Sequence, residues 1–205
     1  MVGRTKKEYR LLGQVPVLAR AVLPFLQEGF SPVVVTVPRG HVQEAAALLG
    51  PHLPPGGLNV VEGGATRQES VLLGLRSLLE ASPEVVLIHD RARPWLTPGL
   101  VRRVAAAAQI HGACVPVVEV SEAVKQVGQS DMVLQHLPRG GIRFAQTPQG
   151  FSFARILAAH EKAAAAGAFC VDDAEVYALF DGPVAWIEGE PDNRKITRER
   201  DLEGA

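Results

Sequence analysis

Short runs of β-branched and aliphatic residues alternate with longer segments of helical periodicity, and this alternation limits the possible folds most strongly. Residues 32–37 (PVVVTV) and 84–89 (EVVLIH) are nearly uninterrupted apolar runs, typical of strands covered on both faces. Strands that alternate with helices indicate crossover connections and a mostly parallel sheet, so we expect an α/β protein. The expected strands are 32–37, 58–61, 84–89, 113–118 and 184–187, and the expected helices are 16–27, 41–49, 67–80, 98 onward, 153–166 and 172–180.

Length and composition restrict the domain organisation and the class of partner. The 205 residues, 47% hydrophobic and 21% charged, suit a single domain over 1–205. A formal net charge of −1 offers no basic surface to nucleic acid, and no segment approaches the ~18 apolar residues of a membrane span. The N-terminal segment has no apolar stretch of a secretory signal, and Cys114 and Cys170 are typical of buried thiols. We therefore expect a cytoplasmic protein that binds neither nucleic acid nor a membrane.

Residues 120–147 differ in residue pattern from the rest of the chain. Charged residues and glycines alternate there with short apolar patches, without a helical or strand period of useful length. This pattern indicates an extended arm within the domain. Its apolar residues include Val124, Val127, Val133, Leu134 and Leu137.

A glycine pair, Gly63 and Gly64, follows the second expected strand and precedes a helix. Ligands of open α/β sheets bind beyond the carboxyl ends of the strands. Paired glycines allow a close backbone approach, and a helix N-terminus favours an anion. The octet from Gly63 to Ser70, which includes Arg67, is therefore a candidate ligand loop. A turn followed by a helix cap explains the same residues, so both interpretations stay open.

Two further charged loops follow expected strands. Asp90 and Arg93 come directly after the strand at 84–89, where a carboxylate could hold hydrated Mg²⁺ and a guanidinium could bind phosphate. Lys195 and Asp192 lie in the loop after the last strand, where a lysine could bind phosphate. Exposed ion pairs and solvated charges are the alternative in both loops. Lys7, in a basic segment before the first helix, has the same two interpretations.

Seven segments, in order, resemble the family of 2-C-methyl-D-erythritol 4-phosphate cytidylyltransferases and the related ribitol-5-phosphate cytidylyltransferases. Each segment alone is weak, but together they extend from Lys6 to Asp201 with the spacing of the family. The matching segments are KKEYRLLGQVPVL, GGATRQESVLLGL, VLIHDRARPW, PVVEVSEAVK, RFAQTPQGF, VDDAEV and EGEPDNRKIT.

The resemblance implies a Rossmann-like sheet of the nucleotidyltransferase type, a homodimer formed through the arm, and transfer of a cytidylyl group from CTP to a polyol phosphate with Mg²⁺. It places Lys7 and Lys195 in catalysis and Asp90 at the ribose and metal. The nucleotide residues it implies are Gly63, Gly64, Arg67, Ser70 and Asp90. The acceptor residues it implies are Arg93, Arg139 and Thr147, the last two from the arm and facing a neighbouring subunit.

The sequence departs from the family pattern at three places. Ala123 and Val171 stand where the family has acceptor-side threonines, so each position loses a hydroxyl donor. The family opens with a strand and a glycine-rich phosphate loop that nothing in this sequence matches, so we expect the first strand to be missing from residues 1–205. These departures leave two alternatives open: a ribitol-5-phosphate enzyme, and a relative that binds nucleotide without catalysis. A dinucleotide-dependent oxidoreductase is disfavoured, because no G-x-G-x-x-G follows a strand.

Overall fold

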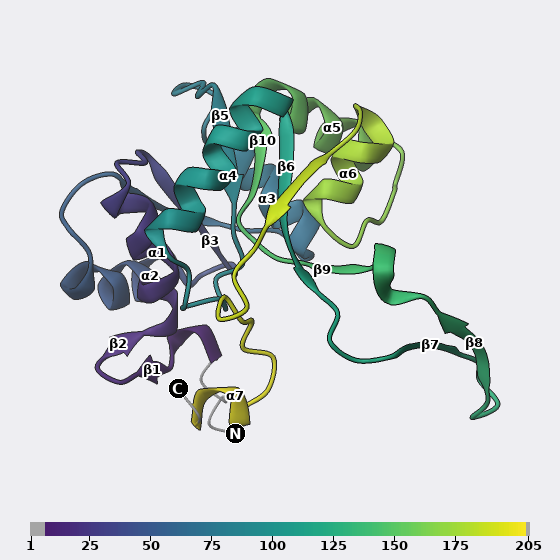
Figure 1. The fold of residues 1–205 in the computed structure, drawn as a ribbon. Coiled ribbons are helices and arrows are strands. Elements are labelled where there is room, and N and C mark those ends of the chain that lie inside the picture. The colour runs from purple at the N-terminus through teal and green to yellow at the C-terminus, as the bar shows by residue number, and fades with distance from the viewer. Residues whose placement is uncertain (1–6, 204–205) are drawn as a thin grey trace.

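The computed structural model describes residues 7–203 and has the α/β architecture expected from the sequence (Figure 1). The helices are α1 (Val17–Gln27), α2 (Val42–Leu49), α3 (Arg67–Arg76), α4 (Pro98–His111), α5 (Phe153–Ala165), α6 (Asp173–Phe180) and α7 (Arg200–Glu203), with short 3-10 turns η1 (Lys7–Tyr9), η2 (Gly50–His52) and η3 (Arg139–Gly141). The strands are β1 (Leu11–Leu12), β2 (Val15–Pro16), β3 (Val33–Val37), β4 (Leu58–Glu62), β5 (Val85–Ile88), β6 (Ala113–Glu119), β7 (Val124–Val127), β8 (Val133–Leu137), β9 (Arg143–Ala145), β10 (Gln149–Ser152) and β11 (Ala185–Glu188).

The main sheet has the expected parallel strands and one antiparallel strand between them. Its order is β11-β6-β10-β5, and β11 runs parallel to β6 while β10 runs antiparallel to both of its neighbours. The strand β10 was not foreseen, because four residues after a proline turn carry no readable period. Gly150 of β10 allows α4 to lie close, since a Cβ there would meet Ala108 Cβ at 2.8 Å. A small residue in the middle of the sheet is thus required by packing.

A second parallel pair, β3 with β4, forms its own hydrogen-bonded sheet. In the described part of the chain β3 and β5 therefore each have one paired neighbour. Side chains join the two sheets: Val34 and Val86 pack against the same core cluster, and Val33 and Leu87 pack against another. The expectation of a missing first strand concerns residues before Lys7, which lie outside the described residues.

Helices cover both faces of the sheet and hold the strand ends in place. On one face, α3, α5 and α6 share a core that includes Leu75, Ile156 and Tyr177. On the other, Phe25 of α1 meets Leu100 and Val104 of α4. The start of α4 is the one predicted, because the Thr97 hydroxyl accepts a hydrogen bond from Leu100 N at 3.1 Å. The helix α3 ends at Arg76, four residues earlier than expected, and a turn follows it.

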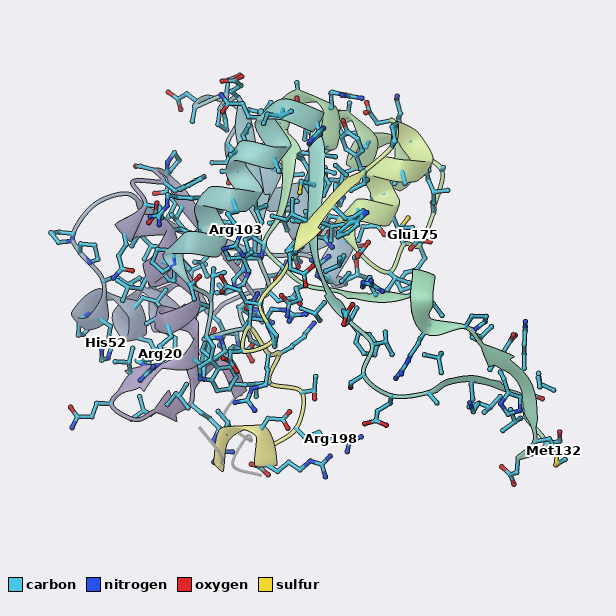
Figure 2. The ribbon with its side chains drawn as sticks, viewed as in Figure 1. Arg20, His52, Arg103, Met132, Glu175 and Arg198 are labelled. Atoms are coloured by element: carbon cyan, nitrogen blue, oxygen red, sulfur yellow. The ribbon has the colours of Figure 1, made fainter. Side chains whose placement is uncertain are left out.

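The segment at 120–147 leaves the body of the protein as an arm, as predicted (Figure 1). The hairpin β7–β8 forms its far part, and Met132 lies at its tip (Figure 2). The strand β9 returns along β6, with Val117 opposite Ala145, and β10 continues along the same edge of β6, with Cys114 opposite Gly150. Residues 146–148 thus connect β9 to β10, two strands that pair with the same edge of β6. Both cysteines are free and buried, as predicted.

Candidate functional site

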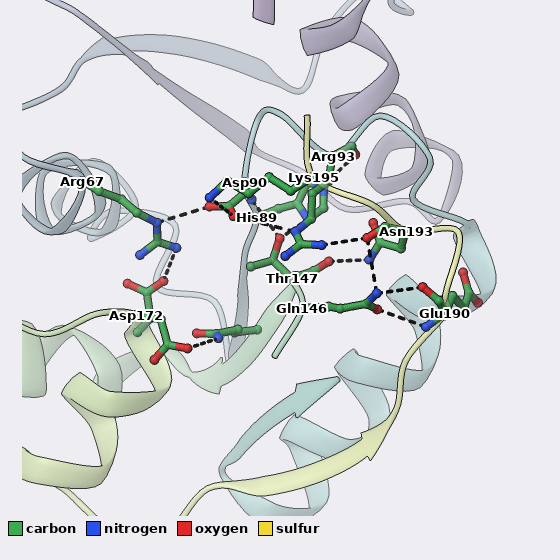
Figure 3. Close-up of polar contacts among 12 residues, drawn as sticks. Arg67, His89, Asp90, Arg93, Gln146, Thr147, Asp172, Glu190, Asn193 and Lys195 are labelled. Atoms are coloured by element: carbon green, nitrogen blue, oxygen red, sulfur yellow. Dashed lines mark hydrogen bonds and ion pairs between the residues drawn. The ribbon is translucent and has the colours of Figure 1, made fainter. Parts of the chain in front are cut away.

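Asp90 lies at the carboxyl end of β5 with three cationic side chains around it (Figure 3). Lys195 Nζ is 2.8 Å from Oδ2, Arg93 Nε is 3.8 Å from the same oxygen, and Arg67 Nε is 3.3 Å from Oδ1. The Asp90 carboxylate is 13% exposed, whereas Lys195 is 40% exposed. The sequence placed these four residues in three separate loops. The fold brings the three loops together.

The electrostatics of this cluster favour full ionisation. Burial alone would raise the pKa of Asp90, but Lys195, Arg67 and Arg93 outweigh it and lower that pKa to about 2. Burial also opposes the charge on Arg67, yet Asp173 and Asp90 raise the pKa of its guanidinium. The cluster therefore carries more positive than negative groups, and such a site attracts an anion such as phosphate.

Arg67 links the cluster to a buried acid that the residue patterns alone did not single out. Its NH2 donates to Asp173 Oδ2 at 2.7 Å, and Asp173 is 1% exposed. Behind Asp173 lies the buried imidazole of His160, with Nε2 3.2 Å from Oδ1. Asp173 belongs to the VDDAEV segment, where only its position at a helix start could be read from sequence. Its pairing with a residue 106 positions away could not.

The backbone N–H groups of the glycine-pair loop already have hydrogen-bond acceptors within the protein. Gly63 N donates to Val37 O at 2.7 Å, Gly64 N donates to Ser70 Oγ at 3.1 Å, and Ala65 N donates to Glu69 Oε2 at 2.8 Å. The loop therefore forms a turn followed by a helix cap, in which Thr66 caps α3. An open cavity of about 590 Å³ adjoins this loop and leaves room for a ligand. The loop and a ligand-sized space therefore occur together.

Thr147 and the Lys195 loop lie beside Asp90. The Thr147 side chain is buried at 5% exposure and its hydroxyl is hydrogen-bonded to the Asp90 amide. Arg93 NH1 donates to Asn193 O at 2.7 Å, which attaches the Lys195 loop to the Asp90 turn. The buried residues Gln146 and Asn193, which were not picked as functional, make the other bonds of this region. Their only signal in the sequence was their place in the matching segments.

Arg139 lies outside this cluster. Arg139 is exposed in the arm and its guanidinium donates to Ser121 O. Lys7 belongs to η1, but its side chain lies outside the described residues. The roles of both residues stay predictions.

The cluster can be compared with what a magnesium ion requires. Within residues 7–203 no group of three or more His, Cys, Asp or Glu side chains could hold a metal. Mg²⁺ commonly binds one or two carboxylates and takes its other ligands from water and substrate phosphates. A single carboxylate at Asp90 fits an ion that arrives with a nucleotide, and it does not fit an ion held by protein alone.

Sequence comparison identifies relatives along the whole chain. Residues 1–205 match the family model described as "IspD: 2-C-methyl-D-erythritol 4-phosphate cytidylyltransferase". The chain is 42% identical over 199 residues to a bifunctional enzyme IspD/IspF of Rhodopseudomonas palustris (strain HaA2), covering 96% of this chain and 49% of that protein. A bifunctional enzyme IspD/IspF of Rhodospirillum rubrum is 42% identical over 205 residues, covering 99% and 52%. The chain thus spans about half the length of these curated relatives.

Solved structures agree with this assignment. The 2-C-methyl-D-erythritol 4-phosphate cytidylyltransferase of Thermus thermophilus is 36% identical, has a TM-score of 0.81, and covers 98% of this chain and 91% of its own. The 4-diphosphocytidyl-2C-methyl-D-erythritol synthase of Anaerococcus prevotii is 25% identical, has a TM-score of 0.87, and covers 97% and 90%. No helix in the described part of the chain is long and apolar enough to cross a membrane. Motifs, fold and relatives agree: the chain belongs to the 2-C-methyl-D-erythritol 4-phosphate cytidylyltransferase family.

Proposed function

We propose that this protein transfers a cytidylyl group from CTP to 2-C-methyl-D-erythritol 4-phosphate and releases pyrophosphate, a step in the synthesis of isoprenoid precursors. The observation that carries the proposal is the convergence of Lys195, Arg93 and Arg67 on Asp90 at the strand ends, in a chain of this family. A phosphate oxygen of the acceptor attacks the α-phosphorus of CTP, and the bond to the β-phosphate breaks.

The side chains act by position and charge. Transfer at phosphorus depends on alignment of the reactants and on stabilisation of developing negative charge. In this proposal Lys195 and Lys7 stabilise that charge, and Arg93 with Arg139 and Thr147 binds the acceptor. Gly63, Gly64, Arg67 and Ser70 form the nucleotide side of the site. The open cavity lined by Gly63 and Gly64 supports their place on the nucleotide side.

We also propose Mg²⁺ as the cofactor. When bound, the ion neutralises charge on the phosphates of the nucleotide. Asp90 is its protein ligand in this proposal, supported by the fit of one carboxylate to an ion that binds with substrate phosphates. Addition of EDTA should then abolish turnover without lowering the melting temperature, because the metal is not part of the folded protein. A fall in melting temperature on chelation would contradict an ion that arrives with CTP.

The activity is tested by pyrophosphate release from CTP and Mg²⁺ with each of two acceptors, methylerythritol phosphate and ribitol 5-phosphate. We expect turnover with the first, none with ATP in place of CTP, and a strong loss in Lys195→Ala and Lys7→Ala at unchanged melting temperature. Turnover with ribitol 5-phosphate and not with methylerythritol phosphate would identify ribitol 5-phosphate as the acceptor. CTP binding without any release of pyrophosphate would identify a non-catalytic relative.

Ala123 and Val171 bear on the acceptor. Ala123 is exposed at the base of the arm and Val171 is 81% exposed, and neither offers a hydroxyl. The acceptor phosphate is then held chiefly by charge, and its KM should rise with ionic strength. Ala123→Thr should lower that KM and leave the KM for CTP unchanged. An unchanged or higher acceptor KM would indicate another acceptor or another set of contacts.

A second copy of this chain is the proposed partner of the arm, and the cytoplasm is the proposed location. The arm carries the exposed apolar side chains of Val127, Met132, Val133 and Leu134, at 67%, 65%, 48% and 63% exposure. A patch of this kind on a projecting hairpin marks an interaction site. Two free buried cysteines support a reducing compartment.

A further inference from the structure

The chain segment that begins with Lys7 is held in place by the two residues that follow it. We call residues 7–9 the Lys7 segment. Lys7 is the first residue of η1, and the next two residues, Glu8 and Tyr9, are both buried. Tyr9 belongs to the core cluster that includes Leu18 and Val22 of α1. The Lys7 segment is therefore packed against α1, and a buried carboxylate comes directly after Lys7.

Glu8 is paired with an arginine of the turn after β5. Arg91 NH2 lies 3.2 Å from Glu8 Oε1, and the two side chains are 42% and 6% exposed, respectively. Arg91 NH1 also donates to Thr36 O of β3, at 3.3 Å. The guanidinium thus joins the Lys7 segment to the turn after β5 and to the end of β3.

The burial of Glu8 distinguishes this pair from an exposed one. A surface ion pair contributes little to stability, because water screens both charges. A buried carboxylate depends on its partner, since it has lost its hydration and cannot regain it without movement of the chain. Loss of Arg91 would therefore drive Glu8 toward solvent. Lys7 would move as well, because the backbone joins it to Glu8.

The turn that carries Arg91 also holds the second lysine proposed for catalysis. Lys195 Nζ lies 2.8 Å from Asp90 Oδ2 (Figure 3), and Ile196 N donates to Ala92 O at 2.8 Å. Asp90 and Ala92 are the two neighbours of Arg91 in the sequence. Three consecutive residues of one turn thus contact both of the segments that carry these lysines.

We infer that Glu8 and Arg91 are positioning residues, which set the Lys7 segment against the turn that holds Lys195. The inference rests on the proposed function for its kinetic part only, in which both lysines stabilise charge at the reacting phosphorus. The geometric part, in which Arg91 holds the Lys7 segment, depends on the ion pair and on the burial of Glu8.

Removal of either partner should lower kcat. In Glu8→Ala and Arg91→Ala the Lys7 segment loses its fixed position, and kcat should fall about tenfold to a hundredfold, as for a reacting group displaced by about 1 Å. The KM values for CTP and for the acceptor should change little, because the lost stabilisation belongs to the transition state. Glu8→Gln keeps an oxygen that can accept from Arg91, so it should retain more of kcat than Glu8→Ala.

A double variant tests whether the pair acts through Lys7. If Arg91 positions Lys7, its loss displaces nothing further once that lysine has been removed. Lys7→Ala/Arg91→Ala should therefore turn over at the rate of Lys7→Ala, so that the two effects are not additive. Multiplication of the two losses would show that Arg91 acts on the reaction independently of Lys7, and would overturn the inference.

Limited digestion with endoproteinase Lys-C reports on the Lys7 segment without turnover. Cleavage after Lys7 should be severalfold faster in Arg91→Ala, because proteolysis follows the population of locally opened chain. Arg91→Ala leaves the sequence at the cleaved bond unchanged. Cleavage after the exposed Lys125 of β7 is the internal reference and should keep its rate.

Arg102→Ala is the matched control, since Arg102 also pairs with a mostly buried glutamate. Its partner is Glu28, at the end of α1, with a side chain 12% exposed. The variant should keep the kcat of the wild type and its rate of cleavage after Lys7. An equal loss of kcat in Arg102→Ala would assign the effect to general destabilisation and overturn the positioning role.

Two further results would overturn the inference: wild-type kcat in Arg91→Ala, whatever its melting temperature, and unchanged cleavage after Lys7. Absence of pyrophosphate release from the wild type would refute the proposed function alone, because digestion still decides whether Arg91 holds the Lys7 segment. If Arg91→Ala does not fold, Arg91→Gln removes the same charge with less loss of bulk and supplies both readouts.

Discussion

At the scale of single residues, the site depends on charges that are paired through the fold and not along the chain. Arg67 bridges the carboxylates of Asp90 and Asp173, and Asp173 is buried between Arg67 and His160. A buried charge is tolerated only when it is paired. Removal of one partner leaves the other charge buried and unpaired, which strongly destabilises the protein. Arg67 therefore keeps its orientation through an acid that has no solvent contact of its own.

Asp173 should make stability depend on acid pH. Burial would raise its pKa, but the His160 imidazole beside it and the Arg67 guanidinium lower it. A carboxyl with a lowered folded pKa stabilises the protein above its unfolded pKa of about 4, and that stability is lost as the pH falls through the folded value. Asp173→Asn should lower the free energy of unfolding by about 1–3 kcal/mol at pH 7. The variant should also lose less of its stability than the wild type between pH 5 and pH 2. Urea midpoints measured across this range give both values.

Asp131→Asn is the matched control for this charge change. Asp131 is exposed in the β7–β8 turn with a φ of 54°, a conformation that asparagine also tolerates. Its midpoint should follow that of the wild type at every pH. An acid profile of Asp173→Asn as steep as the wild-type profile would show that other carboxyls dominate.

At the scale of elements, the turn between β4 and α3 has no space for side chains on its glycines. A Cβ on Gly64 would lie 2.3 Å from Glu69 Cβ and 2.8 Å from its Oε2. The same glutamate accepts from Ala65 N, and Thr66 caps the helix. The turn and the first turn of α3 therefore form one unit, in which the glycine allows the chain to pass close to the helix.

Gly64→Ala should disturb this unit. The added methyl forces Glu69 or the loop to move, which should cost about 1–3 kcal/mol of stability and raise the KM for CTP severalfold. Gly140→Ala in the arm is the control, because a Cβ there meets nothing within 4 Å. Thermal melting and CTP kinetics of the two variants make the comparison. An unchanged KM for CTP in a clearly destabilised Gly64→Ala would remove the loop from the nucleotide site.

At the scale of the whole molecule, a main sheet, the pairs β1–β2 and β3–β4 and a projecting arm are combined in one chain. The body buries its clusters between helices and sheets, whereas the hairpin β7–β8 stands away from the body with apolar side chains exposed (Figures 1 and 2). A lone two-stranded hairpin is marginally stable in water. Association with a second copy would cover it and bring the arm of one copy to the body of the other.

Sedimentation should therefore give about twice the chain mass of 21.9 kDa. Val127→Glu, at a position 67% exposed, should shift the protein toward a monomer, because association would bury an unpaired charge. The control is Ile110→Glu, which changes an apolar residue of similar exposure, 76%, on α4 and outside the arm. A monomeric wild type with full activity would refute the dimer, and dissociation by both variants would exclude the arm as its specific interface.

Local patterns were sufficient for most of the elements. The apolar runs at β3, β5 and β6, the cap at Thr97 and the arm were all predicted, because period, capping and composition act over a few neighbouring residues. Other elements differed from the prediction: the helix expected over 67–80 ends at Arg76, and the strands β1, β2, β7, β8, β9 and β10 were not predicted. The place of β10 depends on packing, since Gly150 lies against α4.

The sequence by itself determined which residue types stand after each strand: a carboxylate at Asp90, cations at Arg67, Arg93 and Lys195, and a glycine pair. These depend on chain order, and their family spacing can be read without coordinates. Only the tertiary structure decided which of them meet. Lys195 reaches Asp90 across the sheet, and Thr147 meets His89 from 58 positions away. Such contacts follow from the order of the strands in the sheet and from the return of the arm along β6. They join residues far apart in the sequence, so no local property of the chain encodes them.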